Sequence, residues 1–190
     1  MKLVMKVVGA VVVLAALALA APLWMYFPGH NFRVVEAGAF YGSRQMGARA
    51  LEAAIKKYNV RTVLNLRGPN AGAGWYDSEV AVCQRLGVAH EDFAWSKGHV
   101  PDPESLRRFV QALETGKRPM LAHCEGGTHR TAVAAACYLL LKGADVATAR
   151  KQFGVMFKDA PIGQLLTLYA PEASMPFGQW ARDRYPALYK

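Results

Sequence analysis

Residues 119–143 read PMLAHCEGGTHRTAVAAACYLLLKG and contain the three successive elements that decide the fold. Pro119–His123 is a short apolar run that predicts a buried strand. Arg130–Leu141 is a strongly apolar stretch that predicts a helix, which Gly143 ends. The six residues 124–129 between them contain two glycines and predict a tight loop. A strand that leads through a tight loop directly into a helix is typical of layered α/β domains.

The loop is suited to bind an anion. Successive backbone N–H groups in such a loop can point inward, and the helix that follows adds the positive end of its dipole. Glycine permits the backbone angles and the close approach that this arrangement needs. We therefore expect a tetrahedral phosphate to be held by Glu125, Gly126, Gly127, Thr128, His129 and Arg130.

Cys124 and Arg130 lie at the two ends of this loop, with five residues between them. A cysteine at a helix N-terminus and near an arginine ionises more readily than a free cysteine, which makes Cys124 a candidate nucleophile. Arg130 can fold back over the loop and hold two phosphate oxygens with its planar guanidinium. Thr131 can donate its hydroxyl to the thiolate or cap the helix, and His123 can brace the loop through its ring nitrogens.

The stretch from His123 to Thr131 resembles the signature of the cysteine-based protein tyrosine phosphatase superfamily, which is His-Cys, five residues, then Arg and Ser or Thr. The segments Phe40–Gln45 and Val63–Arg67 are similar to the compact, bacterial dual-specificity branch, and the resemblance covers residues 32–153. It implies a dual-specificity phosphatase-like fold. It also implies hydrolysis of phosphomonoesters through a cysteinyl-phosphate intermediate on Cys124, without a metal or another cofactor.

The chain departs from this family at three places. Bacterial relatives often read Tyr-Arg-Ser near the start, whereas this chain has Tyr41, Gly42 and Ser43, so no role is assigned to Arg44. Ala132 replaces a frequent glycine. The loop has no lysine and contains Glu125, so we do not expect a multiply phosphorylated inositol head group as the substrate.

The family chemistry also needs an acid that protonates the leaving oxygen. Asp102, at the end of the loop 96–102, is our first candidate, although an Asp before Pro103 is also a normal helix N-cap. Asp92, which lies 32 residues before Cys124, is the second candidate. His99 or Glu104 could substitute, or the position could be vacant.

Further strands and helices alternate along the chain. A strand or hairpin is predicted at 34–41, strands at 61–67 and 88–95, and helices at 48–58, 76–86, 103–115, 145–153 and 162–169. The C-terminal segment with Trp180 and Tyr185 is expected to pack back on the domain. We therefore predict an α/β fold whose central, mostly parallel sheet is flanked by helices.

The N-terminus differs from the rest. Lys2 and Lys6 precede 21 uncharged residues, 7–27, which is long enough to span a bilayer as a helix. This predicts a membrane anchor with the catalytic domain outside the cytoplasm, on the periplasmic side in a bacterium. The alternative is a signal peptide cleaved after Ala18-Leu19-Ala20, which gives a secreted or periplasmic protein. The predicted domains are 1–28, the anchor or signal segment, and 29–190, the phosphatase domain.

The composition limits the partners. The net charge of +9 favours anionic partners, and we expect a phosphorylated protein or small phosphoester. No base-stacking motif or run of basic residues indicates nucleic acid. The three cysteines match neither a disulfide framework nor a zinc site, and the protein is expected to be a monomer. Cys83 and Cys137 are expected to be inert buried thiols.

Two other functions are open. A phosphate-binding domain that is catalytically weak or inactive would keep Cys124 and Arg130 but lack a working acid. A sulfur-transfer enzyme of the rhodanese type would also place a cysteine before a helix, although the ends of the loop fit that family poorly.

Overall fold

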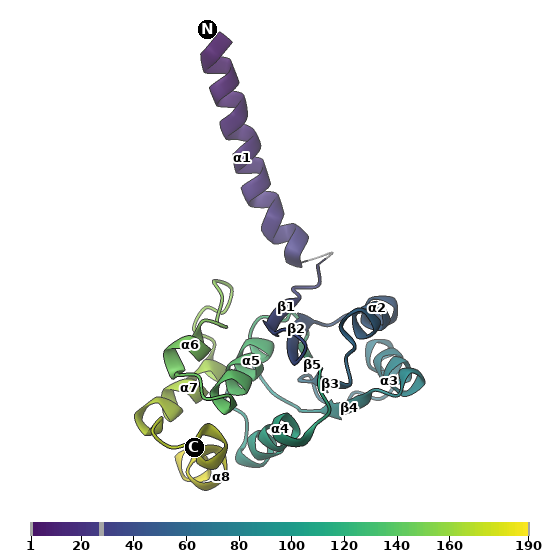
Figure 1. The fold of residues 1–190 in the computed structure, drawn as a ribbon, viewed down its shortest axis with the longest axis vertical. Helices are drawn as coiled ribbons and strands as arrows, with labels where there is room; N and C mark the ends of the chain where they lie inside the picture. The colour runs from purple at the N-terminus through teal and green to yellow at the C-terminus, as the bar shows by residue number, and fades with distance from the viewer. Residues whose placement is uncertain (1, 27–28, 190) are drawn as a thin grey trace.

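The computed structural model describes residues 2–26 and 29–189. The first helix, α1 (Lys2–Tyr26), extends away from the rest of the chain (Figure 1). Its apolar side chains such as Val7, Val11 and Leu14 are exposed. Within the described residues, no helix combines the length and the apolar character that crossing a bilayer requires. Phe27, the last residue of the predicted membrane span, and Pro28, at the predicted domain boundary, lie outside the described residues.

The remaining chain forms a five-stranded mixed sheet in the order β1-β2-β5-β3-β4. The strands are β1 (Arg33–Glu36), β2 (Phe40–Arg44), β3 (Thr62–Asn65), β4 (Ala89–Asp92) and β5 (Met120–Cys124). The edge strand β1 is antiparallel to β2, and the other neighbours are parallel. The predicted α/β class and mostly parallel sheet are therefore confirmed, and the predicted opening hairpin is the β1–β2 pair.

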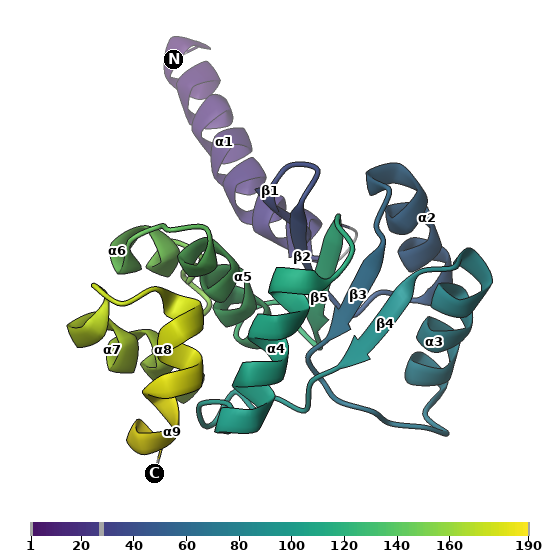
Figure 2. The same ribbon diagram turned by 60° about the horizontal axis from the view of Figure 1, so that its bottom comes forward.

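Helices cover both faces of the sheet (Figure 2). One face carries α2 (Ala48–Tyr58) and α3 (Gly74–Leu86), and the other carries α4 (Pro103–Thr115) and α5 (Arg130–Leu141). The alternation along β5 explains this division, because Leu121 packs into the core under α2 and α3, whereas Met120 and Ala122 pack into the core under α4 and α5.

Short C-terminal helices extend the second layer. They are α6 (Val146–Arg150), η1 (Pro161–Gly163), α7 (Gln164–Tyr169), η2 (Ala170–Glu172), α8 (Phe177–Asp183) and α9 (Tyr185–Leu188). Helix α8 packs against α4 and α5. Trp180 and Tyr185 are both fully buried, so the C-terminal segment does pack back on the domain.

The predicted elements differ from the structure at the ends of some strands and helices. β4 ends at Asp92 instead of 95, because the backbone turns there and the Trp95 amide donates to the Phe93 carbonyl at 2.9 Å. The helix predicted at 145–153 ends at Arg150, and the one predicted at 162–169 divides into η1 and α7. These differences leave the sheet order unaffected.

Candidate active site

Cys124 is the last residue of β5, the central strand of the sheet. Because β5 is parallel to both of its neighbours, the carboxyl ends of β2, β5 and β3 meet at one edge. This is the edge at which open α/β sheets bind their ligands. Cys124 pairs with Arg44 of β2, and only 3% of its surface is exposed. The nucleophile candidate therefore lies at the bottom of the loop that leads to α5.

Gly127 is the residue that the loop conformation demands. Its φ is +69°, a region that other residues rarely adopt. A Cβ atom on Gly127 would lie 2.5 Å from the Arg44 backbone nitrogen and 2.7 Å from the Ser43 carbonyl carbon. Since both contacts are with backbone, no neighbouring side chain could move to relieve them. The loop is thus packed tightly on the end of β2.

Arg130 starts α5 and reaches across the edge of the sheet. Its Nη1 donates to the carbonyl oxygens of Leu66 and Trp95, each at 3.3 Å. Leu66 lies in the loop after β3 and Trp95 in the loop after β4, so these two loops fix the position of the guanidinium. A guanidinium has five N–H donors, and both bonds use the same nitrogen. The remaining donors can serve a phosphate oxygen.

Thr131 has a different role from the two that the sequence suggested. Its buried hydroxyl donates to the Ser43 carbonyl oxygen at 3.2 Å, and it does not cap the helix. The bond fastens the first turn of α5 to β2. In this structure the one proton of the hydroxyl is directed to the backbone of β2 and not to the thiolate.

His123 is buried and bonds to a carboxylate that sequence reasoning missed. Its Nε2 lies 2.9 Å from Oε1 of Glu79 on α3. The same oxygen is 2.9 Å from Nε2 of His90, and Oε2 accepts from Gln45 Nε2 at 2.6 Å. Burial by itself raises the pKa of Glu79, but the hydrogen bonds from His123, His90 and Gln45, together with the charge attraction of His123, outweigh it and lower this pKa to about 2. His123 thus braces the loop through α3.

A signal for Glu79 was present in the sequence. The residue lies three and four positions before Val82 and Cys83, so all three share the buried face of α3. A carboxylate on an apolar helix face is uncommon, and it is stable there only with hydrogen-bond partners. The partners, however, come from β4, from β5 and from the residue after β2, which no local pattern identifies.

Asp102, the first candidate for the acid, is the N-cap of α4. Its carboxylate accepts from the Ser105 amide at 2.9 Å, and the residue is exposed. The preceding Pro101 carbonyl accepts from the hydroxyl of Tyr185. The capping role that the sequence indicated is therefore present in the structure.

Asp92, the second candidate, ends β4 and is held by two donors. Its Oδ1 accepts from Asn65 Nδ2 at 2.7 Å, and its Oδ2 accepts from the Tyr76 hydroxyl at 2.6 Å. Asn65 pairs with Asp92 on one side and with His123 on the other, so Asp92 lies level with His123. Neighbouring strands are about 4.8 Å apart, so the backbone of Asp92 lies two strand spacings, or roughly 10 Å, from that of His123.

The outer part of the loop consists of Glu125, which is exposed, and of the half-buried Thr128 and His129. The His129 ring lies 5.5 Å from the Phe157 ring. Burial and the positive charge of Lys97 both lower the pKa of His129, which favours its neutral form. This side of the loop therefore presents one negative charge and a largely uncharged imidazole.

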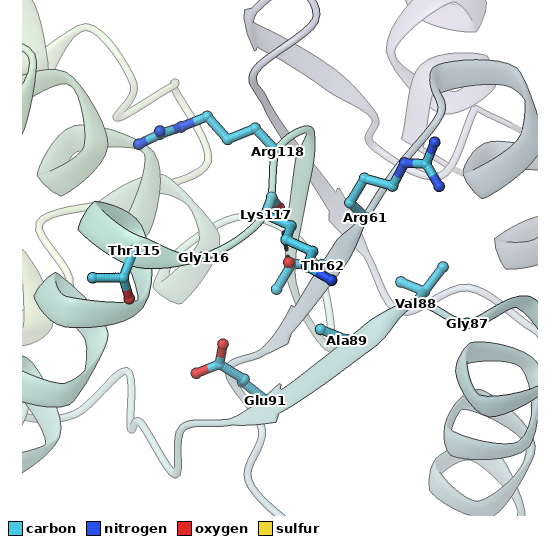
Figure 3. A pocket seen from close by; sticks show the side chains of 10 residues that line it. All are labelled: Arg61, Thr62, Gly87, Val88, Ala89, Glu91, Thr115, Gly116, Lys117 and Arg118. Carbon is cyan, nitrogen blue, oxygen red and sulfur yellow. Dashed lines mark hydrogen bonds between the residues drawn. The ribbon is translucent and has the colours of Figure 1, made fainter.

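A separate cleft lies at another edge of the sheet. It has a volume of about 920 Å³ and is lined by residues at the amino-terminal ends of β3 and β4 and by the segment before β5 (Figure 3). Arg61 and Arg118 line it but extend away from each other, and Arg118 donates to the Leu113 carbonyl at 2.6 Å. Because this edge is opposite to Cys124, the cleft is separate from the candidate active site.

Comparison with known proteins agrees with this geometry. The family model described as "Swiss Army Knife protein, DSP-PTPase phosphatase domain" matches residues 30–168. The search of curated protein sequences found no match.

Several solved structures share the fold. The catalytic core of the PP-IP phosphatase Siw14 from S. cerevisiae has a TM-score of 0.57 and 16% identity, over 74% of this chain and 83% of that one. PTPMT1 has a TM-score of 0.55 and 17% identity, over 75% and 96%. TpbA from P. aeruginosa has a TM-score of 0.54 and 21% identity, over 78% and 86%.

Proposed function

This chain belongs to the family of Swiss Army Knife DSP-PTPase phosphatase domains, and from that membership we propose which of its residues carry out the reaction. Members of this family are cysteine-based phosphatases, so the chain hydrolyses phosphomonoesters without a metal. The observation that carries the assignment of residues is the position of Cys124. It lies at the base of a tight loop on the central strand, and the guanidinium of Arg130 is anchored across the same edge of the sheet.

The reaction proceeds in two steps. The Cys124 thiolate attacks phosphorus, so that an S–P bond forms while the P–O bond to the leaving group breaks. The amides of residues 125–129 and the guanidinium of Arg130 stabilise the charge on the phosphoryl oxygens. An acid, for which Asp102 is our first assignment, protonates the leaving oxygen. Water then attacks phosphorus, breaks the S–P bond and releases phosphate.

The experiment is steady-state hydrolysis of p-nitrophenyl phosphate by the full chain. We expect activity in the presence of EDTA, and a loss of at least about 10³-fold in Cys124→Ser, since a hydroxyl is far less ionised than the thiol. Activity that survives in Cys124→Ser, or that requires an added metal ion, would falsify this mechanism.

A second candidate is a phosphate-binding domain with little turnover. The observation that favours it is the state of the two candidate acids, because Asp102 caps a helix and Asp92 is bonded to Asn65 and Tyr76. Strong binding of vanadate together with negligible turnover would identify this second function. Rapid turnover with an alkaline limb in the pH profile would exclude it.

We propose that the substrate carries a single phosphate. Glu125 is exposed at the loop, where its charge repels a second phosphate group. TpbA has been crystallised with phosphotyrosine and PTPMT1 with PI(5)P, so the shared fold admits different leaving groups. Phosphate release from a phosphotyrosine peptide should therefore exceed release from a polyphosphorylated inositol. The reverse order would contradict the proposal.

We also propose that the domain functions outside the cytoplasm. The support is in the sequence, where Lys2 and Lys6 precede the uncharged residues 7–27, and α1 leaves its apolar side chains exposed. Protease added to intact spheroplasts that express the full chain should digest the domain. A domain that is protected until the cells are lysed would contradict this proposal.

A further inference from the structure

Three successive carbonyl groups of the loop are bonded to one segment near the N-terminus. The Glu125 carbonyl accepts from the Gln45 amide at 3.2 Å, and the Gly126 carbonyl accepts from Asn31 Nδ2 at 3.0 Å. The Gly127 carbonyl accepts from Nη2 of Arg33. Asn31 is 95 residues and Arg33 is 94 residues from its partner in the sequence. The loop is thus held by the β1–β2 hairpin and by the residues just before and after it.

These bonds determine which way the loop amides point. In a trans peptide, the carbonyl and the following N–H point in opposite directions. Since the carbonyls of 125, 126 and 127 are directed to the N-terminal segment, the N–H groups of 126, 127 and 128 are directed away from it, toward the opposite side of the loop. Inward N–H groups are what an anion-binding loop requires. The N-terminal segment therefore orients the donors without touching the anion.

Arg33 reaches the loop by crossing β2 at Gly42. The two residues face each other in the antiparallel β1–β2 pair. A Cβ atom on Gly42 would lie 3.1 Å from Cγ and 3.3 Å from Cδ of Arg33, and 2.8 Å from Cγ2 of Thr131. The absence of a side chain at Gly42 thus leaves the path open. Arg33 Nη1 also donates to the Gln152 carbonyl at 3.2 Å, so its guanidinium links the loop to the segment after α6.

Arg33 also places a positive charge near the nucleophile. Burial lowers the pKa of its guanidinium, whereas attraction to the Cys124 thiolate raises it. The guanidinium therefore lies close enough to Cys124 for their charges to interact. An arginine stays protonated even when it is half-buried.

We propose that Asn31 and Arg33 are positioning residues, which hold the phosphate loop in its anion-binding conformation from outside the site. The proposal rests on the function proposed above. Neither residue belongs to the His-Cys-x5-Arg motif, and Asn31 comes only a few residues after α1. Residues 31 and 33 thus support the site from outside its sequence motif.

Full-length variants test this proposal. Arg33→Met removes the charge and both bonds, and Arg33→Lys keeps the charge but cannot bridge two carbonyls in the same way. Asn31→Gly removes only the amide, because the residue has a φ of +45°, which glycine adopts without strain. Arg49→Met is the matched control, since Arg49 is an exposed arginine on α2.

Two measurements are made on each variant. The first is the affinity for tungstate, followed by the thermal shift that it produces, and we expect a loss of about 10-fold or more in Arg33→Met and a smaller loss in Asn31→Gly. The second is the pH dependence of iodoacetamide alkylation of Cys124. Its midpoint should move to higher pH in Arg33→Met, return most of the way in Arg33→Lys and stay unchanged in Arg49→Met and Asn31→Gly.

The outcomes separate the two proposals. Wild-type protein that binds no tungstate would contradict the phosphate site itself. Wild-type protein that binds tungstate, with Arg33→Met and Asn31→Gly equal to Arg49→Met in affinity and alkylation, would overturn the positioning roles and leave the proposed function standing. Should Arg33→Met not fold, Asn31→Gly and Arg33→Lys decide the question, because unchanged tungstate affinity in both would also overturn it.

Discussion

Replacement of Glu79, which lies outside the loop, should lower the stability of the folded protein substantially. It is 1% exposed, and its carboxylate accepts from His123, His90 and Gln45. In Glu79→Gln, the new amide nitrogen replaces the acceptor that faces Gln45 Nε2, so two donors would meet. Gln45 cannot simply turn over, because its own Oε1 accepts from Arg67 Nη1 at 3.2 Å. In the opposite orientation the amide nitrogen faces Nε2 of His123 and His90, which accept only if both rings change tautomer, so either orientation disturbs the buried network.

The expected cost follows from the charge and from the lost bond. A pKa of about 2 for Glu79 instead of its ordinary 4.5 corresponds to about 3 kcal/mol in favour of the folded protein. An unsatisfied buried donor costs about 1–3 kcal/mol. The two estimates overlap, because both count the bonds of one carboxylate, so we expect Glu79→Gln to lower the free energy of unfolding by about 3 kcal/mol at pH 7. Domain stabilities are about 5–15 kcal/mol, so this loss is large.

Urea denaturation of the full chain, followed by circular dichroism, measures this loss. Because the folded pKa lies below the unfolded one, the contribution of the Glu79 charge is complete above about pH 4.5 and declines as the pH falls toward 2. The difference between wild type and variant should therefore shrink between pH 5 and pH 3. A difference under about 0.5 kcal/mol at pH 7, or one that is equal at pH 5 and pH 3, would refute the reasoning.

Glu52→Gln is the matched control. The pKa of Glu52 is also lowered to about 2, by hydrogen bonds from Arg85 and Lys56. Its side chain is 27% exposed, however, and its partners are exposed at 57% and 65%, so water and salt screen the pairs. We expect the stability of Glu52→Gln to be close to that of wild type. The same pKa thus has a different consequence for stability in the two places.

Two further predictions concern the chemistry. Asp102→Asn keeps a good N-cap but removes the acid, whereas Asp102→Ala also costs about 1 kcal/mol of stability. If Asp102 is the acid, the rate of phenyl phosphate hydrolysis falls about 10²–10⁴-fold in both variants. A loss of rate in Asp92→Asn alone would assign the role of the acid to Asp92. At neutral pH, peroxide should inactivate the enzyme through Cys124 and dithiothreitol should restore it, since burial raises the pKa of Cys83 to about 12 and also raises that of Cys137. Modification found by mass spectrometry on Cys83 or Cys137 would show that the wrong thiol was chosen.

The first and last residues of several helices could be predicted from the sequence, because particular residue types mark helix ends. Helices at 48–58, 103–115 and 130–141 have the bounds that the sequence indicates. For α4 the reason is visible, because Asp102 caps it, Pro103 occupies its first position and Gly116 ends it. Strand ends have no comparable signal. Nothing local shows that β4 stops at Asp92, and the residues after it bond to distant partners, as the Trp95 carbonyl does to Arg130.

The residues of the site also fall into two groups, those that the sequence identifies and those that only the structure identifies. Cys124, Arg130 and the residues between them are recognisable because they are consecutive and because the strand and helix around them are clear. Asn31 lies just before β1 and Arg33 at its start, and both bond to the loop, whereas Glu79 comes from α3 and bonds to His123. Their side chains have no characteristic spacing relative to Cys124. Long-range hydrogen bonds of this kind are determined by strand order, which the sequence alone leaves open.

The loop needs such partners because of its own composition. Residues 125–129 include two glycines, and glycine loses more conformational freedom on folding than any other residue. The Thr128 hydroxyl lies 3.4 Å from the Gly126 carbonyl, a long and weak bond within the loop. The conformation is instead imposed by β2 below Gly127, by the N-terminal segment on the carbonyls, and by α3 through His123. The motif therefore identifies the chemistry, whereas the affinity for phosphate depends on donors that lie up to about 95 residues away.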